Sequence, residues 1–433
     1  MLDRLCRGGH VSVNSRISGL RDASPQERLQ IVTQQRGLPA DRLAAFDVRQ
    51  GLDLERANHM VENVVGMVAV PLGVATNFIV DGDDCLVPMA TEEPSVVAAA
   101  SNAARMARPH GGFITSHTGS VMIAQIQLVD VADPRAARLR IYEAEGELLE
   151  LANEEDPVLQ ELGGGAVGLE VRILPTALGE HVIVHLHADV RDAMGANAVN
   201  SMAEALAPRL QALTGARPLL RILSNKADLR VTRVRATFDS DLLGGPAVVD
   251  DILLASAFAT ADPFRAATHN KGIMNGVTAV VLATGNDTRA VEAGCHSFAA
   301  REGAYRALSS YEKDDAGNLV GTMELPLAVG LVGGATKAHP AAQASIALIG
   351  ADSAQRLAAV IASVGLAQNL AACRALAAEG IQRGHMALHA RTVAASAGAE
   401  AAEISEIARR IVAAGRIRID DARRELDLLR AGK

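Results

Sequence analysis

The sequence predicts an α+β protein that is divided into domains, and three observations support this fold class. The chain has 433 residues, more than one hydrophobic core usually contains, so two or three domains are expected. Long stretches rich in alanine and glycine predict helices that pack closely through small side chains, and aromatic residues make up only 2% of the chain. Between residues 113 and 225 the pattern changes to alternating apolar and polar residues, which is typical of half-buried strands.

The first part of the chain predicts helices separated by short strands. Ser24-Pro25-Gln26-Glu27 has the order of an N-cap, a first-turn proline and a capping-box glutamate, and Gly37 ends the helix that they begin. Strand-like apolar segments follow at 68–72 and 85–87. Pro94 then stands in the first turn of an alanine-rich helix that we expect to be buried and to extend to about residue 106.

The middle of the chain predicts one compact β-α-β-β-α-β unit. The expected elements are a strand at 121–131, a helix at 133–153, strands at 169–173 and 182–186, a helix at 196–213 and a strand at 219–223. This order is the split βαβ arrangement of a ferredoxin-like domain. We therefore expect such a domain to be inserted into a larger, mainly helical one.

The last part predicts a return to the larger domain and then a separate cap. Residues 226–375 have mixed composition with a loop-rich centre, and small-residue helices follow from Asp352. Beyond a Ser/Ala/Gly hinge at 395–399 come two charged amphipathic helices, which suggest a mobile helical cap or flap. The expected division is 1–112 and 226–379 for the large domain, 113–225 for the inserted domain and 380–433 for the cap.

Composition excludes several classes of protein. The formal net charge is −8 and basic residues form no stripe, which disfavours nucleic acid as a partner. No apolar run reaches the length of a membrane span and no cationic amphipathic helix suggests a membrane surface. Cysteines at positions 6, 85, 295 and 373 form no CxxC pair, so free thiols are expected. Because the N-terminus also lacks a signal-peptide pattern, we expect a cytoplasmic protein.

The segment Arg265–Gly276, with Asp287 shortly after it, has the strongest chemical character. Lys271 can stabilise a developing oxyanion, Asp287 can hold that lysine charged and aimed, and Arg265 can bind a substrate carboxylate. A solvated Gly/Asn loop with a surface ion pair would explain each residue alone. Their clustering favours a site.

Glycine-rich turns argue against a Rossmann nucleotide site. The run at 163–165 precedes a strand, and no Gly-x-Gly-x-x-Gly opens a helix. The turn Asp192–Asn197 lies between a strand and a helix, where Gly195 would let a pyrophosphate approach the backbone. A tight turn capped by Asp192 is an equally good explanation of this motif by itself.

Metal and serine-nucleophile sites have weaker support. His385 and His389 are four residues apart, but the zincin glutamate is missing and no third ligand stands at a suitable spacing. We therefore expect no metal, and interpret His385 as a proton donor in a mobile segment. Ser95 is not in a Gly-x-Ser-x-Gly elbow.

Several of these motifs together resemble one enzyme family. The blocks are Glu62–Gly66, Glu92–Ser95, Asp192–Asn197, His269–Gly276, Ala283–Asp287, Gly330–Thr336 and Gly384–Met386. In this order they resemble 3-hydroxy-3-methylglutaryl-CoA reductase, in particular the bacterial class II form. The resemblance extends from about residue 20 to the C-terminus.

The resemblance implies reduction of a thioester to mevalonate with release of coenzyme A, by two successive hydride transfers, or the reverse oxidation. It implies that Lys271 stabilises the carbonyl oxygen, Asp287 orients that lysine, Glu93 donates a proton, and His385 protonates the departing thiolate. It assigns the hydroxymethylglutaryl end of the substrate to Ser95, Arg265 and Asn275. It assigns the nicotinamide cofactor to Asp192, Met194, Gly195, Asn197 and Asn225.

Cofactor choice and assembly are further implications. Asp156 matches the position that meets the adenosine ribose in class II enzymes, where a carboxylate accepts from a 2′-hydroxyl and repels a 2′-phosphate. We therefore expect NADH to be preferred over NADPH. The family also implies a homodimer with the active site at its interface, and possible assembly into a hexamer. Two alternatives stay open on the residues alone: a metallohydrolase that uses His385, His389 and Asp287, and a non-catalytic acyl-CoA-binding protein.

Overall fold

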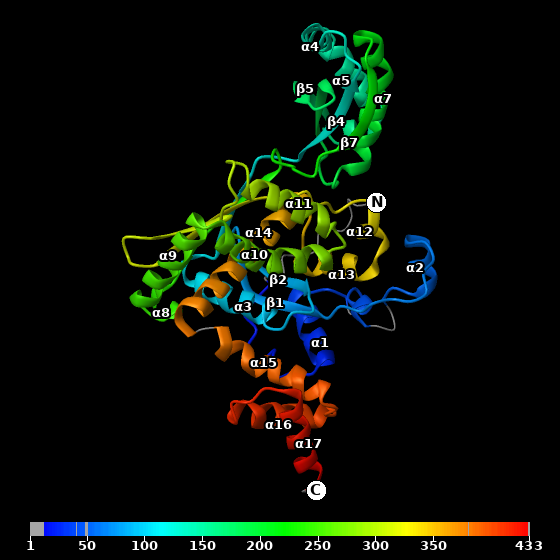
Figure 1. Cartoon of the computed structure of the whole chain (residues 1–433). Coiled ribbons are helices and arrows are strands. Elements are labelled where there is room, and N and C mark those ends of the chain that lie inside the picture. The colour runs from blue at the N-terminus through cyan, green and yellow to red at the C-terminus, as the bar shows by residue number, and fades with distance from the viewer. Residues whose placement is uncertain (1–12, 40, 48–50, 380, 432–433) are drawn as a thin grey trace.

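The structure, a computed structural model, describes residues 13–39, 41–47, 51–379 and 381–431, and it contains two β-sheets (Figure 1). The larger sheet contains β1 (Leu72–Val80), β2 (Asp83–Ala90), β3 (Phe113–His117), β8 (Val231–Phe238), β9 (Ser309–Lys313) and β10 (Leu319–Pro326). Its strand order is β2-β1-β3-β8-β10-β9. The smaller sheet contains β4 (Val121–Val129), β5 (Gly165–Thr176), β6 (Gly179–Asp189) and β7 (Arg217–Leu223), in the order β5-β6-β4-β7.

Helices surround the larger sheet. They are α1 (Pro25–Arg36), α2 (Leu54–Met60), α3 (Val96–Ala107), α8 (Ser240–Leu243), α9 (Pro246–Ala261), α10 (Pro263–Ala283), α11 (Thr288–Ala299), α12 (Gly334–Ala338), α13 (Pro340–Ile349) and α14 (Ala354–Arg374). The stretch Ala354–Ala377, which includes α14, is long and apolar enough to cross a membrane, but 83% of its apolar window is buried inside the molecule. It packs against α10, α3 and the sheet, as the core helix of this unit.

The smaller sheet has its own helices and its own core. Helices α4 (Pro134–Glu143), α5 (Glu145–Glu154), α6 (Pro157–Glu161) and α7 (Ala196–Thr214) cover one face, where apolar side chains of β4 and β6 are fully buried. All pairings between its strands are antiparallel. Figure 1 shows this unit projecting from one end of the larger one.

Helices α15 (Ile381–Ser396), α16 (Ala401–Ala413) and α17 (Ile419–Ala431) form a third unit with a small apolar core. In Figure 1 they lie at the end opposite the smaller sheet. The two amphipathic helices predicted for this region correspond to α16 and α17. A turn at Ala397–Ala399, inside the predicted hinge, separates them from α15.

Local sequence signals near the N-terminus have mixed outcomes. The capping box of α1 is present, because Ser24 and Glu27 bond each other's backbone N–H groups, and Gly37 ends the helix in a left-handed conformation. The prediction that Pro94 occupies the first turn of the next helix was wrong. Ser95 is the N-cap of α3, with φ of 77°, so the chain turns sharply after Pro94 and the helix begins at Val96.

Other predicted elements also need correction. The loop-rich centre expected around 265–276 is part of the long helix α10. The predicted helix at 133–153 is interrupted at Ala144, which ends α4. Strand β3 pairs with β1 and β8 in the larger sheet, so residues 113–117 do not belong to the smaller sheet, whose first strand begins at Val121.

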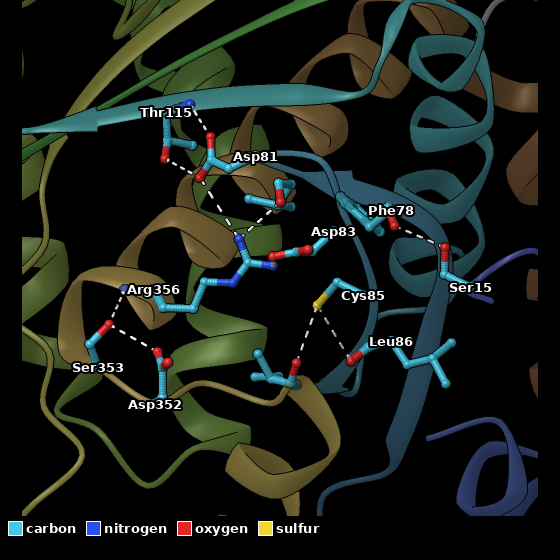
Figure 2. Close-up of polar contacts among 12 residues, drawn as sticks. Ser15, Phe78, Asp81, Asp83, Cys85, Leu86, Thr115, Asp352, Ser353 and Arg356 are labelled. Carbon is cyan, nitrogen blue, oxygen red and sulfur yellow. Dashed lines mark hydrogen bonds and ion pairs between the residues drawn. The ribbon is translucent and has the colours of Figure 1, made fainter. Parts of the chain in front are cut away.

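The start of α14 is anchored to the larger sheet by Arg356 (Figure 2). Its guanidinium donates to the carbonyl oxygen of Val80 at 2.9 Å and lies 3.8 Å from Asp81 and 3.6 Å from Asp83. Asp81 in turn accepts hydrogen bonds from the backbone and hydroxyl of Thr115 on β3. The β1–β2 turn, β3 and α14 are thereby joined through one cation.

The smaller unit is joined to the larger one by a buried arginine. Arg230, which is 5% exposed, donates to the carbonyl oxygens of Ala193 and Met194 at 3.0 and 3.2 Å and of Val329 at 2.6 Å. Burial lowers the pKa of Arg230 to about 10. Asp192 Oδ1 accepts a hydrogen bond from the backbone N–H of Ala354, at the start of α14.

We expect the replacement Arg230→Met to destabilise this junction, because it leaves buried carbonyl oxygens without donors. The expected loss in the free energy of unfolding is about 2 to 4 kcal/mol, measured by urea denaturation. The matched control is Arg233→Met, which removes an exposed ion pair with Glu324 and should cost less than about 1 kcal/mol. Equal effects from the two variants would contradict the structural role given to Arg230.

Candidate active site

Three predicted site residues lie on α10. Lys271 and Asn275 are four residues apart and therefore share a helix face, whereas Arg265 is about a third of a turn away from Lys271 and shares its face with His269, four residues later. Lys271 is exposed, whereas Arg265 and Asn275 are half-buried. Asp262 caps this helix by accepting a hydrogen bond from the backbone of Arg265.

The side of α10 that faces away from Lys271 is fixed by buried hydrogen bonds. His269 Nε2 lies 2.7 Å from Ser309 Oγ and 3.1 Å from Asn369 Nδ2. Asn270 donates to the carbonyl oxygen of Arg306 and accepts from the backbone of Leu308. Polar residues of one motif thus divide into two groups, one that anchors the helix and one that faces outward.

The structure brings Glu93 and Lys271 together across the sequence. Lys271 Nζ donates to Glu93 Oε2 at 2.7 Å, and the two side chains are 60% and 34% exposed. Glu93 lies in the turn before α3, where its backbone N–H donates to Thr91 Oγ1. Ser95 follows in its left-handed conformation, and its side chain makes no capping hydrogen bond.

Asp287 lies at the start of α11. It is the N-cap of α11, accepting from the backbone of Arg289 and Ala290 at 2.9 and 3.1 Å, and it lies 3.6 Å from the Arg289 guanidinium. Within the described part of the chain, the carboxylate that pairs with Lys271 is Glu93, and Asp287 lies beyond ion-pair distance of this lysine.

Three of the motif turns converge beside the junction. Ala193 forms a bridge with Val332, and a side chain at Gly330 would overlap the backbone of Ala193 and Met194. The side-chain oxygen of Asn286 accepts from the backbone of Gly330 at 2.8 Å. Glycine is required at position 330 because two chain segments touch there.

The remaining nicotinamide candidates lie at the start of α7 and nearby. Gly195 is the N-cap of α7 with φ of 98°, and a side chain there would overlap Val190. Asn197 and Asn225 are exposed, and Met194 is half-buried. Asp156 is the N-cap of α6, accepting from the backbone of Leu159 at 2.9 Å, rather than the end of the preceding helix.

A hollow of about 360 Å³ lies beside Arg265. Asp251, Ala255 and Phe258 of α9 contribute to its lining, together with Leu376 and Ala377. His385 lies in α15, but its side chain is outside the described part of the structure. The hollow therefore connects Arg265 with the segment that leads to the predicted flap.

Comparisons with known proteins show the family of this chain. The family model described as hydroxymethylglutaryl-coenzyme A reductase matches residues 24–390. The chain belongs to the hydroxymethylglutaryl-coenzyme A reductase family. The 3-hydroxy-3-methylglutaryl-coenzyme A reductase of Archaeoglobus fulgidus is 54% identical over 420 residues, which cover 97% of this chain and 96% of that protein.

Solved structures of the class II reductase are also similar. A Streptococcus pneumoniae reductase superimposes with a TM-score of 0.81 at 40% identity, covering 95% of this chain and 99% of that one. A second structure of that enzyme, titled as class II and bound to NADPH in open conformations, gives a TM-score of 0.80 at 41% identity and covers 83% of this chain and 99% of that one. The chain is thus a class II, bacterial-type member of this oxidoreductase family.

Sequence inspection missed two groups that hold the elements of the candidate site in place. His269 was part of a recognised motif but had no assigned role, and its partners Ser309 and Asn369 were not singled out. Arg230 was also missed. Neither His269 nor Arg230 could be recognised from the periodicity of the sequence, because their hydrogen-bond partners lie far away in the chain.

The buried imidazole of His269 predicts a pH dependence of stability. Burial, and secondly the charge of Arg265, lower the pKa of His269 from 6.5 to about 4. Between those values the unfolded chain binds more protons than the folded one, so the free energy of unfolding should fall as pH falls from about 6.5 to 4. This group would account for about 3 kcal/mol of that loss.

Urea denaturation from pH 4.5 to 7.5 checks this expectation. His269→Gln should show a shallower dependence on pH than the unaltered protein. His59→Gln, at an exposed position on α2, is the control and should keep the original slope. An unchanged slope in His269→Gln would show that another group titrates.

Proposed function

We propose that this reductase interconverts 3-hydroxy-3-methylglutaryl-CoA and mevalonate plus coenzyme A, with two successive hydride transfers. The observation that carries the proposal is the 2.7 Å contact between Lys271 and Glu93, on the outward face of α10. It places a fixed cation beside a carboxyl group. Both are needed where a carbonyl becomes an alkoxide and then an alcohol.

The protein groups divide the reaction between charge stabilisation and proton transfer. The bound nicotinamide supplies or accepts the hydride. Lys271 would stabilise the oxygen as negative charge develops there, and Glu93 in its protonated form would donate to that oxygen. His385 would protonate the departing thiolate, whose conjugate acid has a pKa of about 8.5.

We retain Asp287 as the proposed orienting partner of Lys271 in the substrate-bound state. The ammonium group of Lys271 is largely exposed here and its long side chain can turn away from Glu93. Asp287 would contact Lys271 only after this movement of the lysine side chain, whereas Glu93 contacts Lys271 directly in this structure. Arg265, Ser95 and Asn275 are proposed to hold the hydroxymethylglutaryl end.

The unit built on the smaller sheet is proposed as a ferredoxin-like, non-Rossmann nicotinamide domain, inserted between the two halves of the substrate domain. Its antiparallel strand order supports this proposal. The residues at the start of α7 fit a pyrophosphate, since Gly195 leaves no side chain over the first backbone N–H groups. Residues 380–433 are proposed as the flap that carries His385.

We further propose a homodimer with the active site at its interface, and possible assembly into a hexamer. Large apolar side chains are exposed in two of the motifs: Phe264 beside Arg265 is 84% exposed, and Val65 in the motif that begins at Glu62 is 98% exposed. A partner would bury them. It would also lower the dielectric around Lys271, which strengthens its interaction with a developing oxyanion.

A cytoplasmic location is proposed as well. Cys85, Cys295 and Cys373 are free and buried, which suits a reducing compartment. Cys6 lies outside the described residues. Coenzyme A, mevalonate and their thioester are the proposed small-molecule partners, without nucleic acid, membrane or a catalytic metal.

The central test is Lys271→Ala, with nicotinamide absorbance followed in both reaction directions. Loss of one oxyanion stabiliser typically lowers turnover about 100- to 1,000-fold, and we expect at least that effect. Lys313→Ala removes another exposed lysine–carboxylate pair, with Asp250, and should keep near-normal turnover because neither residue belongs to the proposed catalytic set. Near-normal turnover of Lys271→Ala would contradict the proposal.

The same assay separates the alternatives. A metallohydrolase would lose activity to chelators, and an acyl-CoA-binding protein would bind coenzyme A without any change in nicotinamide absorbance. Turnover that resists chelators, together with loss in Lys271→Ala, is the outcome expected for the reductase.

We also propose that NADH is preferred over NADPH through Asp156. One of its oxygens caps α6, and the other has no hydrogen-bond partner among the described residues, so it can accept from a ribose 2′-hydroxyl. The similar Streptococcus pneumoniae structure is titled as bound to NADPH. The proposal therefore concerns a preference between two related cofactors.

Asp156→Asn tests this preference, because asparagine keeps the cap and removes the charge. The NADPH to NADH ratio of kcat/KM should rise about tenfold, which corresponds to about 1.4 kcal/mol. Glu154→Gln, at the nearby end of α5, is the matched control for general loss of negative charge. An unchanged ratio in Asp156→Asn would remove this residue from cofactor selection.

A further inference from the structure

The face of the smaller sheet that lies away from its helices carries a row of histidines. In β6 the side chains of Val182, Val184, Leu186 and Ala188 belong to the core, so the alternate residues point to the other face. These alternate residues include His181, His185 and His187. Residues i and i+2 of a strand project side by side from one face of the sheet. Imidazoles in such a row can therefore bind one metal ion together.

A carboxylate from the neighbouring strand completes a group of three. Glu170 of β5 is directly opposite His185, and its Oε2 lies 3.7 Å from His185 Nδ1. One potential ligand atom from each of Glu170, His185 and His187 lies within 4.8 Å of the others. Ligands of a tetrahedral ion at about 2.1 Å are about 3.4 Å apart, so small side-chain rotations would bring the group to that spacing.

The hydrogen bonding of this group is incomplete. His187 Nε2 is buried and has no hydrogen-bond partner among the described residues. A buried polar atom without a partner costs about 1 to 3 kcal/mol, so such an atom calls for a ligand or another explanation. Gly168 is the cross-strand neighbour of His187, and the space above it is open.

We propose that Glu170, His185 and His187 form a binding site for a divalent late transition-metal ion of the Zn²⁺ class. Two imidazoles and one carboxylate are a set that zinc accepts, with water in the fourth position. The Glu170 side chain is 54% exposed, so solvent reaches the ion, whereas His185 is 8% exposed and gives a fixed ligand. This site is separate from Lys271 and Glu93, and does not depend on the proposed function.

Gln125 of β4 supports the assignment of ligand atoms. It is opposite His185 on the other side, with its side-chain nitrogen 2.9 Å from His185 Nε2. Rotation of the amide by half a turn presents its oxygen instead, which would accept a proton from Nε2 and leave Nδ1 free to face Glu170. A histidine ligand usually donates its second N–H in this way.

The charges around the group are mixed. Glu170 and Asp228 contribute negative charge near His185, and Arg172, two residues beyond Glu170 on β5, contributes positive charge. Burial lowers the pKa of His185, so its ring is neutral at neutral pH, as a ligand must be.

A metal ion here would clamp β5 to β6. The last residues of β6 lead directly to Asp192, the turn that contacts Ala354 and Arg230. The ion would thus stabilise the smaller unit from the face that its helices leave uncovered. Its role is structural, and turnover is not expected to require it.

The test uses the full chain after chelator treatment and dialysis, titrated with ZnCl₂ by calorimetry and counted by elemental analysis. All variants carry His389→Ala, which removes the helical His385/His389 pair as a competing site. We expect about one tightly bound Zn²⁺ per chain and a higher melting temperature with the ion. CoCl₂ should give the visible absorption of a tetrahedral site.

His187→Ala and Glu170→Gln should each lose the stoichiometric ion and the melting shift. Gln125→Leu should weaken binding about 10- to 100-fold. His181→Ala, on the same strand and face but outside the group, is the matched control and should bind normally. Circular dichroism of each metal-free variant checks folding, and Glu170→Gln changes no side-chain shape.

Two results would overturn the proposal. One is the absence of stoichiometric Zn²⁺ in the folded His389→Ala protein, which would leave only a contact between Glu170 and His185. The other is equal Zn²⁺ binding by His187→Ala, Glu170→Gln and the protein that carries only His389→Ala, which would place the ion elsewhere. Neither result would affect the assignment of Lys271, whose test is reductase turnover.

Discussion

The two-sided character of α10 is the constraint on which the site depends. Its inner side is tied to β9 and α14 through His269, Ser309 and Asn369, which are all buried and hydrogen-bonded. A helix fixed in rotation by such contacts presents the same outer residues each time it folds. Lys271 can therefore meet Glu93, which arrives from the turn before α3 in a distant part of the sequence.

A second constraint joins the smaller unit to this frame. Arg230 offers donors to three carbonyl oxygens that belong to two different segments, and Asp192 bonds the first turn of α14. The same helix is held on the sheet by Arg356. Helix α14 is buried along most of its length. Its start contacts both the proposed nicotinamide unit, through Asp192, and the larger sheet, through Arg356, and so joins the two units.

The proposed metal group and the proposed active site differ in how far their side chains are exposed to solvent. Lys271 and Glu93 are accessible in one chain, and a partner or substrate would complete their surroundings. His185 is buried on a sheet face and His187 is half-buried beside it, with its Nε2 atom buried and unpaired among the described residues, which has a free-energy cost. The first pattern suits a reaction site and the second suits a structural ligand.

The sequence by itself predicted features that depend on residues close together in the chain. The capping box of Ser24 and Glu27 was confirmed, since all its atoms lie within one turn, and the alternation at 169–173 and 182–186 corresponds to β5 and β6. Ordered motifs also identified the class II reductase family. Strand β8 was missed, although the alternation in Val231–Phe238 could have revealed it.

Tertiary structure decided which polar residues of a motif face outward and what they meet. Nothing in the order of residues 265–276 distinguishes a loop from a helix once glycine and asparagine lower helix propensity, and burial against α14 favoured the helix. The pairing of Lys271 with Glu93, rather than Asp287, likewise depends on distances through space. Such contacts join residues far apart in the chain, where sequence periodicity carries no information.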